Sequence, residues 1–327
     1  MKALAGRIGL YLLTAWAAIT INFFIPRLMK GDAVDAVLGQ VNGAQVDPRA
    51  IQSLRVAFGL TKSSNPIADY FQYLGNILRG DLGISLHNFP QPVSDVIAQA
   101  LPWTLLLVGV STLLSFAIGT GLGIISGWKR GSWLDILAPV TTFFSSMPYF
   151  WFALIILTIF AIDLNLFPFQ GGYSGDTVIG WNLPFIGSAI QHAILPAFTI
   201  VVASLGGWLI GMRNMMVTTQ SEDYMLVAEA KGLSVRRRSL SYAARNAILP
   251  NITSFALSLG FVVSGAILTE IVFSYPGIGY LLFQAVQNRD FPLMQGLFLI
   301  ITLTVLGANL LADVSYTLLD PRTRKNG

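Results

Sequence analysis

Long apolar stretches alternate with polar segments along this chain, and six of the apolar stretches are long enough to cross a lipid bilayer. A bilayer core about 30 Å thick needs about 20 apolar residues in a helix, because a helix satisfies its backbone polar groups within one segment. The predicted spans are residues 8–28, 101–127, 134–162, 193–212, 248–272 and 295–316. The pattern therefore predicts an all-α polytopic membrane protein with six transmembrane helices.

The polar segments divide the chain and orient it. We expect a first transmembrane helix at 1–29, an extracytoplasmic insertion at 30–99 that is mainly helical, a five-helix core at 100–320 with a cytoplasmic loop at 213–247, and a cytoplasmic tail at 321–327. The loop at 163–192 contains no Lys or Arg, whereas the loop at 213–247 contains six. Because cytoplasmic loops carry the excess of Lys and Arg, both termini are predicted to be cytoplasmic.

Composition narrows the classes of function. Only 11% of the residues are charged, against about a quarter in soluble domains, so a soluble protein is excluded. There is no cysteine, and the two histidines, His87 and His192, lack the spacing of a metal-ligand motif, so no metal site is expected. No Asp, Glu, Lys or Arg lies in the middle of a predicted span. This argues against an ion-coupled carrier, which needs a coupling charge at that depth.

The insertion at 30–99 contains two predicted amphipathic helices, at 48–58 and 67–78, separated by turn signals. On the second of these helices, one face holds Ile67, Tyr70, Phe71, Leu74, Ile77 and Leu78. The insertion is either a small cap packed on the outer surface of the bundle or a docking surface for an external partner. The two interpretations are compatible.

Small residues and prolines predict how the second and third spans pack. Gly119, Gly123 and Gly127 recur every fourth residue in the second span, a spacing typical of close helix–helix packing. A phosphate-binding loop is excluded here, because no strand precedes the glycines and no Lys-Ser/Thr follows them. Pro139 and Pro148 predict bends in the third span.

The predicted cytoplasmic loop has the pattern helix, glycine, helix. Ser221 is expected to cap the first helix, Gly232 to close it in the left-handed conformation, and Ser234 to cap the second helix. The small side chains of Ala228 and Ala230 would let another protein approach the backbone closely. On the residues alone, the alternative is an amphipathic helix at the membrane surface with positive-inside charge.

Several positions in this loop match a known motif: Ala228, Ala230, Lys231, Gly232, Leu233, Arg245, Asn246, Ala247 and Pro250. Together they resemble the EAA-type loop of binding-protein-dependent ABC importer permeases, in the branch that imports oligopeptides, dipeptides and nickel. Leu226 stands where the motif has its glutamate, so the match is incomplete at that position. Segments at 23–28, 80–85, 270–279, 288–290 and 319–322 resemble the same family.

The resemblance implies a type I ABC importer permease bundle in the prokaryotic cytoplasmic membrane that catalyses no reaction itself. The implied partners are a second homologous permease subunit, two ABC ATPase subunits (or one fused), an extracytoplasmic substrate-binding protein and membrane lipid, with no nucleic acid. ATP and Mg are expected in the ATPase subunits. This chain has no Gly-x4-Gly-Lys-Ser/Thr motif, and no cofactor of its own is expected.

The resemblance also suggests roles for individual residues. Those implied to couple to the ATPase are Tyr224, Ala228, Glu229, Ala230, Lys231, Gly232, Leu233, Arg236 and Arg237. The expected contacts with the binding protein are Tyr70, Tyr73, Pro276, Arg289 and Asp290. The expected lining of the translocation path is Phe143, Phe144, Tyr149 and Trp208, because aromatic rings pack peptide side chains or stack on sugars. Oligopeptides or dipeptides are the expected substrate. Oligosaccharides such as gluco-oligosaccharides, or nickel, are alternatives, and an ion-coupled carrier is a more distant one.

Overall fold

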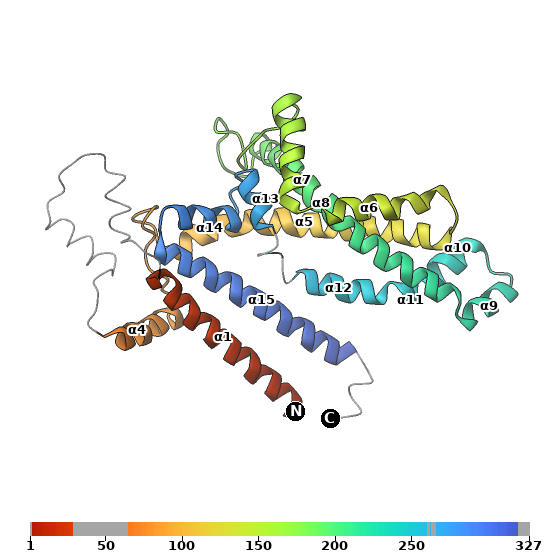
Figure 1. Cartoon of the computed structure of the whole chain (residues 1–327), viewed down its shortest axis with the longest axis horizontal. Helices are drawn as coiled ribbons and strands as arrows, with labels where there is room; N and C mark the ends of the chain where they lie inside the picture. Colours follow the sequence, from red (N-terminus) through yellow and green to blue (C-terminus); the bar gives the residue numbers. More distant parts are fainter. Residues whose placement is uncertain (1, 29–64, 260–261, 263–265, 320–327) are drawn as a thin grey trace. The chain divides into compact units, whose positions relative to one another are not determined.

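The structure is a computed structural model that describes residues 2–28, 65–259, 262 and 266–319 (Figure 1). The described residues form helices, turns and loops, with one isolated bridge between Ile84 and Pro92. They fall into two compact units, one made of Met1–Trp103 with Gly277–Gly327 and the other of Thr104–Pro276. The predicted all-α class is confirmed for this part of the chain, and the predicted helix at 48–58 lies outside it.

The first unit contains α1 (Lys2–Leu28), α4 (Pro66–Leu78), the start of α5 (Val93–Trp128), α14 (Ile278–Gln287) and α15 (Phe291–Leu319). α1 and α15 pack along each other (Figure 1). The start of α5 lies against α15 at Gly296, where a methyl group would be 2.5 Å from Val93 Cγ1. A side chain at this position is therefore excluded by the packing.

α4 begins at a strong cap. The Asn65 side-chain oxygen accepts hydrogen bonds from the backbone N–H groups of Ile67 and Ala68, and Pro66 occupies the first helical turn. Both features stabilise a helix start, because the first N–H groups of a helix have no partner within it. The helix predicted at 67–78 is confirmed.

The second unit contains the rest of α5 and all the remaining elements. These are η1 (Trp133–Ile136), α6 (Leu137–Ser146), α7 (Tyr149–Ile156), η2 (Leu157–Asp163), α8 (Leu183–Gln220), α9 (Asp223–Ala230), α10 (Val235–Arg237), η3 (Arg238–Ala244), α11 (Arg245–Ala247), α12 (Leu249–Leu259) and α13 (Ile267–Val272). α8 packs against both α6 and α7. It is therefore the central element of this unit.

Three helices in the described part of the chain are long and apolar enough to span a membrane, namely Val93–Trp128, Leu183–Gln220 and Phe291–Leu310. The third predicted span is broken, because α6 and the α7–η2 segment meet at 99°. Pro148 lies at this break and has no N–H to continue a helix, so the bend predicted there is confirmed. At Pro139 the helix is not interrupted, because Pro139 lies in the first turn of α6, where a missing N–H costs nothing.

Two other predicted spans are not among these. The first, at 8–28, lies within the helix α1 (Lys2–Leu28), whose described apolar segment is Gly9–Phe24. The fifth predicted span is divided into α12 and α13, and most of the residues between these helices lie outside the described part. The described residues therefore hold three spans, or four if the bent pair counts as one, and they do not confirm the prediction of six.

Gly119, Gly123 and Gly127 bring α5 directly against α8. A methyl group at Gly123 would lie 2.6 Å from the Leu209 carbonyl oxygen and 2.7 Å from Met212 Cβ. The positions of the other two glycines are equally crowded by α8. The close packing predicted from the four-residue spacing is confirmed.

Candidate functional site

The short helix α9 in the predicted cytoplasmic loop ends at a glycine. Gly232 has a φ of +68°, and its N–H donates to the Glu229 carbonyl at 2.8 Å, while the Leu233 N–H donates to the Ala228 carbonyl at 3.3 Å. These two bonds form a Schellman motif, in which glycine adopts a left-handed conformation that a Cβ would strain. The predicted closing role of Gly232 is confirmed.

One face of α9 is held by an apolar cluster, which we call the methionine cluster. Its buried members are Met212, Met216, Met225, Ala243, Ala244 and Ala247. Ile124 and Trp128 at the end of α5 and Tyr224 of α9 pack against them. The cluster joins α9 to α5, α8, η3 and α11, and flexible methionine side chains suit such an irregular junction.

Two polar contacts add to this attachment. The Asn246 side-chain N–H donates to the Tyr224 hydroxyl at 3.0 Å, and Glu229 forms an ion pair with Arg238 of η3. Glu229 is 65% exposed, so the ion pair contributes little stability by itself. The contacts orient α9 relative to the segment that follows it.

The other face of α9 is exposed. Leu226 is 65% exposed and Val227 is 52% exposed. The remaining exposed residues from Glu222 to Arg237 are Glu222, Asp223, Glu229, Ala230, Lys231, Gly232, Ser234, Val235, Arg236 and Arg237. An apolar centre with a charged rim is a composition suited to contact with another protein.

Ala228 is an exception among the residues expected to couple to a partner. It is only 2% exposed, so its side chain faces the protein's own interior. The expectation that Ala228 gives another protein close access to the backbone is wrong, because the chain itself occupies that space. Ala230 is exposed and stays a prediction, while Leu233 is half-buried.

The predicted caps of the loop need correction. α8 continues to Gln220, further than predicted, so Ser221 caps the end of α8 and its hydroxyl donates to the Thr218 carbonyl at 2.7 Å. Glu222 takes the position preceding α9, without a side-chain bond. Ser234 occupies the predicted position before α10, but its side chain also makes no capping bond.

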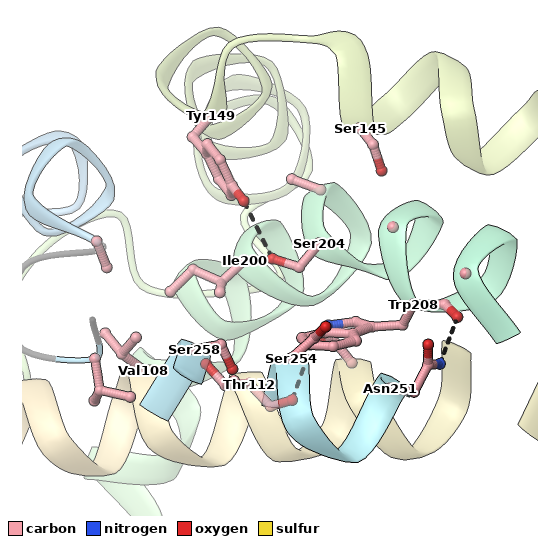
Figure 2. Close-up of a pocket in the computed structure, with 16 residues that line it drawn as sticks. Val108, Thr112, Ser145, Tyr149, Ile200, Ser204, Trp208, Asn251, Ser254 and Ser258 are labelled. Atoms are coloured by element: carbon pink, nitrogen blue, oxygen red, sulfur yellow. Dashed lines mark hydrogen bonds between the residues drawn. The ribbon is translucent and has the colours of Figure 1, made fainter. Parts of the chain in front are cut away.

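A cavity of about 540 Å³ lies within the second unit (Figure 2). Its lining comes from α5, α6, α7, α8 and α12 and from the segment leading to α13. The polar side chains in the lining are Thr112, Ser115, Ser145, Tyr149, Ser204, Asn251, Ser254 and Ser258. None of the described lining residues is charged, so the cavity offers neutral hydroxyl and amide groups to a ligand.

Hydrogen bonds hold part of this lining. The Tyr149 hydroxyl and the Ser204 hydroxyl are 3.2 Å apart, and the Asn251 side-chain N–H donates to the Trp208 carbonyl at 3.2 Å (Figure 2). The Asn251 N–H also lies 3.4 Å from the Thr120 hydroxyl. The carbonyl of Trp208 is therefore satisfied by a side chain from α12.

Two of the four aromatic residues that were expected to line a translocation path line this cavity. Tyr149 and Trp208 line the cavity, whereas Phe143 and Phe144 are not among its described lining residues. Phe143 is 64% exposed, and the ring of Phe144 packs against Phe152 with centroids 5.5 Å apart. Serine and threonine outnumber aromatic residues in the cavity wall.

Sequence reasoning missed these hydroxyl groups, although a signal was present. Thr112 and Ser115 lie three residues apart on α5, and Ser254 and Ser258 lie four apart on α12. Both spacings put two hydroxyls on the same face of a helix. A search for polar side chains at helical spacing inside apolar stretches would have found them.

Tyr70 and Tyr73 are half-buried and attach α4 to α1, while their expected contact with a binding protein stays a prediction. The Tyr70 and Thr20 hydroxyls are 2.6 Å apart, and the Asn22 side-chain N–H donates to the Tyr73 hydroxyl at 3.2 Å. Both rings pack against Phe23, with centroids 5.2 and 5.4 Å away. Their described contacts are therefore within the chain.

Asp290 is fully buried, so the predicted contact of its side chain with another protein is wrong. Its carboxylate accepts hydrogen bonds from the Ser85 hydroxyl at 2.6 Å, the His87 N–H at 3.0 Å and the Leu293 N–H at 3.1 Å. It caps α15 and holds the turn that precedes α5. The neighbouring Arg289 is exposed, with a φ of +53°.

Pro276 is half-buried. Two buried residues precede it, Glu270 and Tyr275. Glu270 is 1% exposed and accepts a hydrogen bond from the Thr104 hydroxyl at 2.7 Å. Burial, with the charge of Glu270 nearby, raises the pKa of Tyr275, so its phenol stays protonated.

The described residues contain no group of three or more His, Cys, Asp or Glu side chains that could hold a metal ion. The ring of His192 is buried, and its Nδ1 lies 2.8 Å from the Ser188 carbonyl. His192 lies inside α8, and His87 is exposed in a turn.

Comparison with known proteins adds to this geometry. Residues 119–325 match the family described as binding-protein-dependent transport system inner membrane component. The chain is 32% identical to the oligopeptide transport system permease protein AppB of Bacillus subtilis, over 92% of both chains. It is 34% identical to the di/tripeptide transport system permease protein DppB of Pseudomonas aeruginosa, over 99% of both. It is also 31% identical to the dipeptide transport system permease protein DppB of Escherichia coli K12, over 97% of both.

Proposed function

The chain belongs to the family of inner membrane components of binding-protein-dependent transport systems, and we propose that it is a permease subunit of an ATP-driven peptide importer. The observation that carries the proposal is the near full-length similarity to permeases named for oligopeptide, di/tripeptide and dipeptide transport. In this role the chain catalyses no reaction and forms half of a path across the cytoplasmic membrane.

The cavity supports a peptide as the transported molecule. Peptides carry a neutral backbone amide at each residue, and hydroxyl groups both donate to and accept from such amides. The uncharged lining gives the wall no preference for one sign of side-chain charge. Tyr149 and Trp208 add apolar surface next to the hydroxyls, as ligand sites commonly do.

The exposed face of α9 supports a coupling role. We propose that it fits into a groove of an ABC ATPase subunit, with Leu226 and Val227 at the centre and charged side chains around them. Closure of the ATPase pair around ATP and Mg then displaces α9. The methionine cluster passes the displacement to α8, where Met212 lies four residues from the cavity residue Trp208. This is a two-state rigid-body switch driven by a ligand that binds the two states differently.

The proposal includes the rest of the assembly. The bundle has six spans with both termini in the cytoplasm, consistent with the Lys and Arg distribution. A second homologous permease supplies the other half of the path, and two ATPase subunits, or one fused pair, bind the cytoplasmic side. An extracytoplasmic binding protein delivers the substrate.

Purification and reconstitution test the proposal. The tagged chain is isolated from its native membrane, its partners are identified by mass spectrometry, and the complex is placed in liposomes with ATP inside. We expect a second permease, ATPase subunits and a binding protein to co-purify, and ATP to drive uptake of a labelled di- or oligopeptide.

Three results would count against it. ATP-dependent uptake of an oligosaccharide but no peptide would support the importer mechanism and contradict the proposed peptide substrate. Binding of nickel by the co-purified binding protein would also support an importer and contradict the peptide substrate. Uptake by the chain alone, without ATP and under an ion gradient, would replace the importer with a carrier.

A further inference from the structure

α4 presents one face to the protein and leaves a second, apolar face exposed. Tyr70 and Tyr73 hold it against α1, as described above. Outside this contact, Ile67 is 68% exposed, Phe71 is 64% exposed and Leu78 is 87% exposed. The described part of the first unit therefore leaves three large apolar side chains of a 13-residue helix uncovered.

The exposed apolar side chains form one stripe. At 100° per residue, Ile67, Phe71, Leu74 and Leu78 fall within about 60° of arc around the helix. The same geometry puts Asp69, Gln72 and Asn76 together on nearly the opposite side. The two tyrosines lie between the stripe and the polar side, so α4 has an apolar face, a polar face and a face packed on α1.

A row of aromatic rings connects the apolar stripe to an exposed ring of α1. The rings of Phe24 and Phe23 are 5.2 Å apart, those of Phe23 and Tyr70 are 5.2 Å apart, and those of Tyr70 and Phe71 are 5.8 Å apart. Phe23 and Tyr70 in the middle of the row are buried and half-buried, whereas Phe24 and Phe71 at its ends are 48% and 64% exposed. The exposed apolar side chains of the two helices therefore flank one aromatic contact.

The end of α1 beside this contact carries further exposed apolar side chains. Near Phe24 in the sequence, Ile21 is 60% exposed and Leu28 is 79% exposed. In a membrane protein, such side chains at the end of an apolar helix contact acyl chains, and aromatic rings gather at the boundary between acyl chains and headgroups. A helix whose apolar and polar faces are opposite, and which packs beside such an end, matches a helix lying in the plane of that boundary.

We propose that α4 is an interfacial helix that lies in the outer boundary layer of the membrane, with its apolar stripe in the acyl chains and its polar face in water. The stripe carries no charge, unlike the exposed face of α9, and the exposed Arg79 at its end is positioned for a lipid headgroup. The inference rests on the proposed function only in assigning this end of α1 to the outer surface.

The absence of cysteine from the chain makes a direct test possible. Phe71→Cys and, as a matched control on the polar face, Gln72→Cys are each labelled with a nitroxide in the complete transporter in lipid nanodiscs. For each label, the rate at which the nitroxide collides with oxygen, which concentrates in acyl chains, is compared with the rate at which it collides with a water-soluble nickel chelate. We expect the oxygen-to-nickel ratio to be several-fold higher at Phe71 than at Gln72, and Leu78→Cys to behave like Phe71→Cys.

Two outcomes would overturn the proposal. Equal access of the nickel chelate to both labels would put the stripe in water. Protection of the Phe71 label from both probes would assign the stripe to a protein, either residues 29–64 or the binding protein. Peptide uptake by the same preparations is measured separately, so a failure of the importer assignment is distinguished from a failure of this one.

Discussion

α4 and α9 are both short helices that hold one face against the chain and expose another, but they are attached by different chemistry. α4 is fixed by hydroxyl groups and aromatic rings, and its start is capped by Asn65. α9 has no side-chain cap at its start and is fixed by the methionine cluster and by the closing turn at Gly232. The free face of α4 is an uncharged stripe, whereas that of α9 mixes leucine and valine with charged residues.

The different free faces of α4 and α9 indicate two kinds of partner, a lipid surface and a protein surface. A lipid surface accepts an uncharged apolar stripe, because acyl chains offer no group to pair with a charge. A protein surface accepts apolar side chains surrounded by charges, because its own rim can pair with them. Each of the following changes tests one attachment or one free face.

The largest effect on transport is expected from Gly232→Trp. A side chain at a φ of +68° costs about 1–2 kcal/mol and opens the closing turn of α9. We expect ATP-driven peptide uptake to be lost, with ATP hydrolysis continuing and the complex still assembled. Gly131→Trp is the matched control, because Gly131 also has a positive φ, +75°, and no atom within 4 Å of a Cβ. Full uptake by the Gly232→Trp complex would contradict the coupling role.

The attachment of α9 is tested by Met225→Ala. Met225 is 6% exposed in the methionine cluster, so truncation leaves a cavity that costs about 2–5 kcal/mol. We expect a lower thermal unfolding temperature of the purified complex. Leu226→Ala removes a side chain of similar size that is 65% exposed, and should leave unfolding unchanged while weakening co-purification of the ATPase. Similar unfolding temperatures for the two variants would refute this division of α9.

A smaller effect is expected from Gly127→Ala. The added methyl group would lie 2.6 Å from Met216 Cβ, which belongs to the methionine cluster. Overpacking of this kind costs about 1–3 kcal/mol. Gly121→Ala, with nothing within 4 Å, provides the control and should be neutral in the same unfolding measurement. Equal stability of the two variants would argue against the α5–α8 contact.

The smallest effect is expected on α4, from Asn65→Ala. This change removes two hydrogen bonds to the first turn and costs about 1 kcal/mol. We expect faster amide hydrogen exchange at Ile67 and Ala68, with exchange in α9 unaffected. Gln72→Ala serves as the control, because Gln72 is exposed in the middle of the helix. Unchanged exchange at the first turn would show that packing on α1 alone maintains α4.

Features set by neighbours in sequence were predictable. The helix at 67–78, the left-handed Gly232, the close approach of Gly123 to α8 and the break at Pro148 all follow from local pattern and residue type. In each case the cause is the conformational limit of one residue or the period of one helix. The importer family was also recognisable from the order of several short motifs.

Features set by distant neighbours were not predictable. The inward orientation of Ala228 depends on a surface built by other helices, and the burial of Asp290 depends on Ser85, about 200 residues earlier in the chain. The hydroxyl lining of the cavity is distributed over separate helices, each with only one or two such groups. A periodic pattern identifies a face, but it does not say what covers that face.

The glycine seam between α5 and α8 has a mechanical consequence. Gly119 stands against Trp208, which lines the cavity, and Gly127 stands against Met216, which belongs to the methionine cluster. At Gly119, Gly123 and Gly127 the α5 backbone meets α8 with no α5 side chain in between, so none can absorb a displacement there by changing rotamer. We therefore expect the pair to be stiff, so that a displacement at the methionine cluster reaches the cavity with little loss.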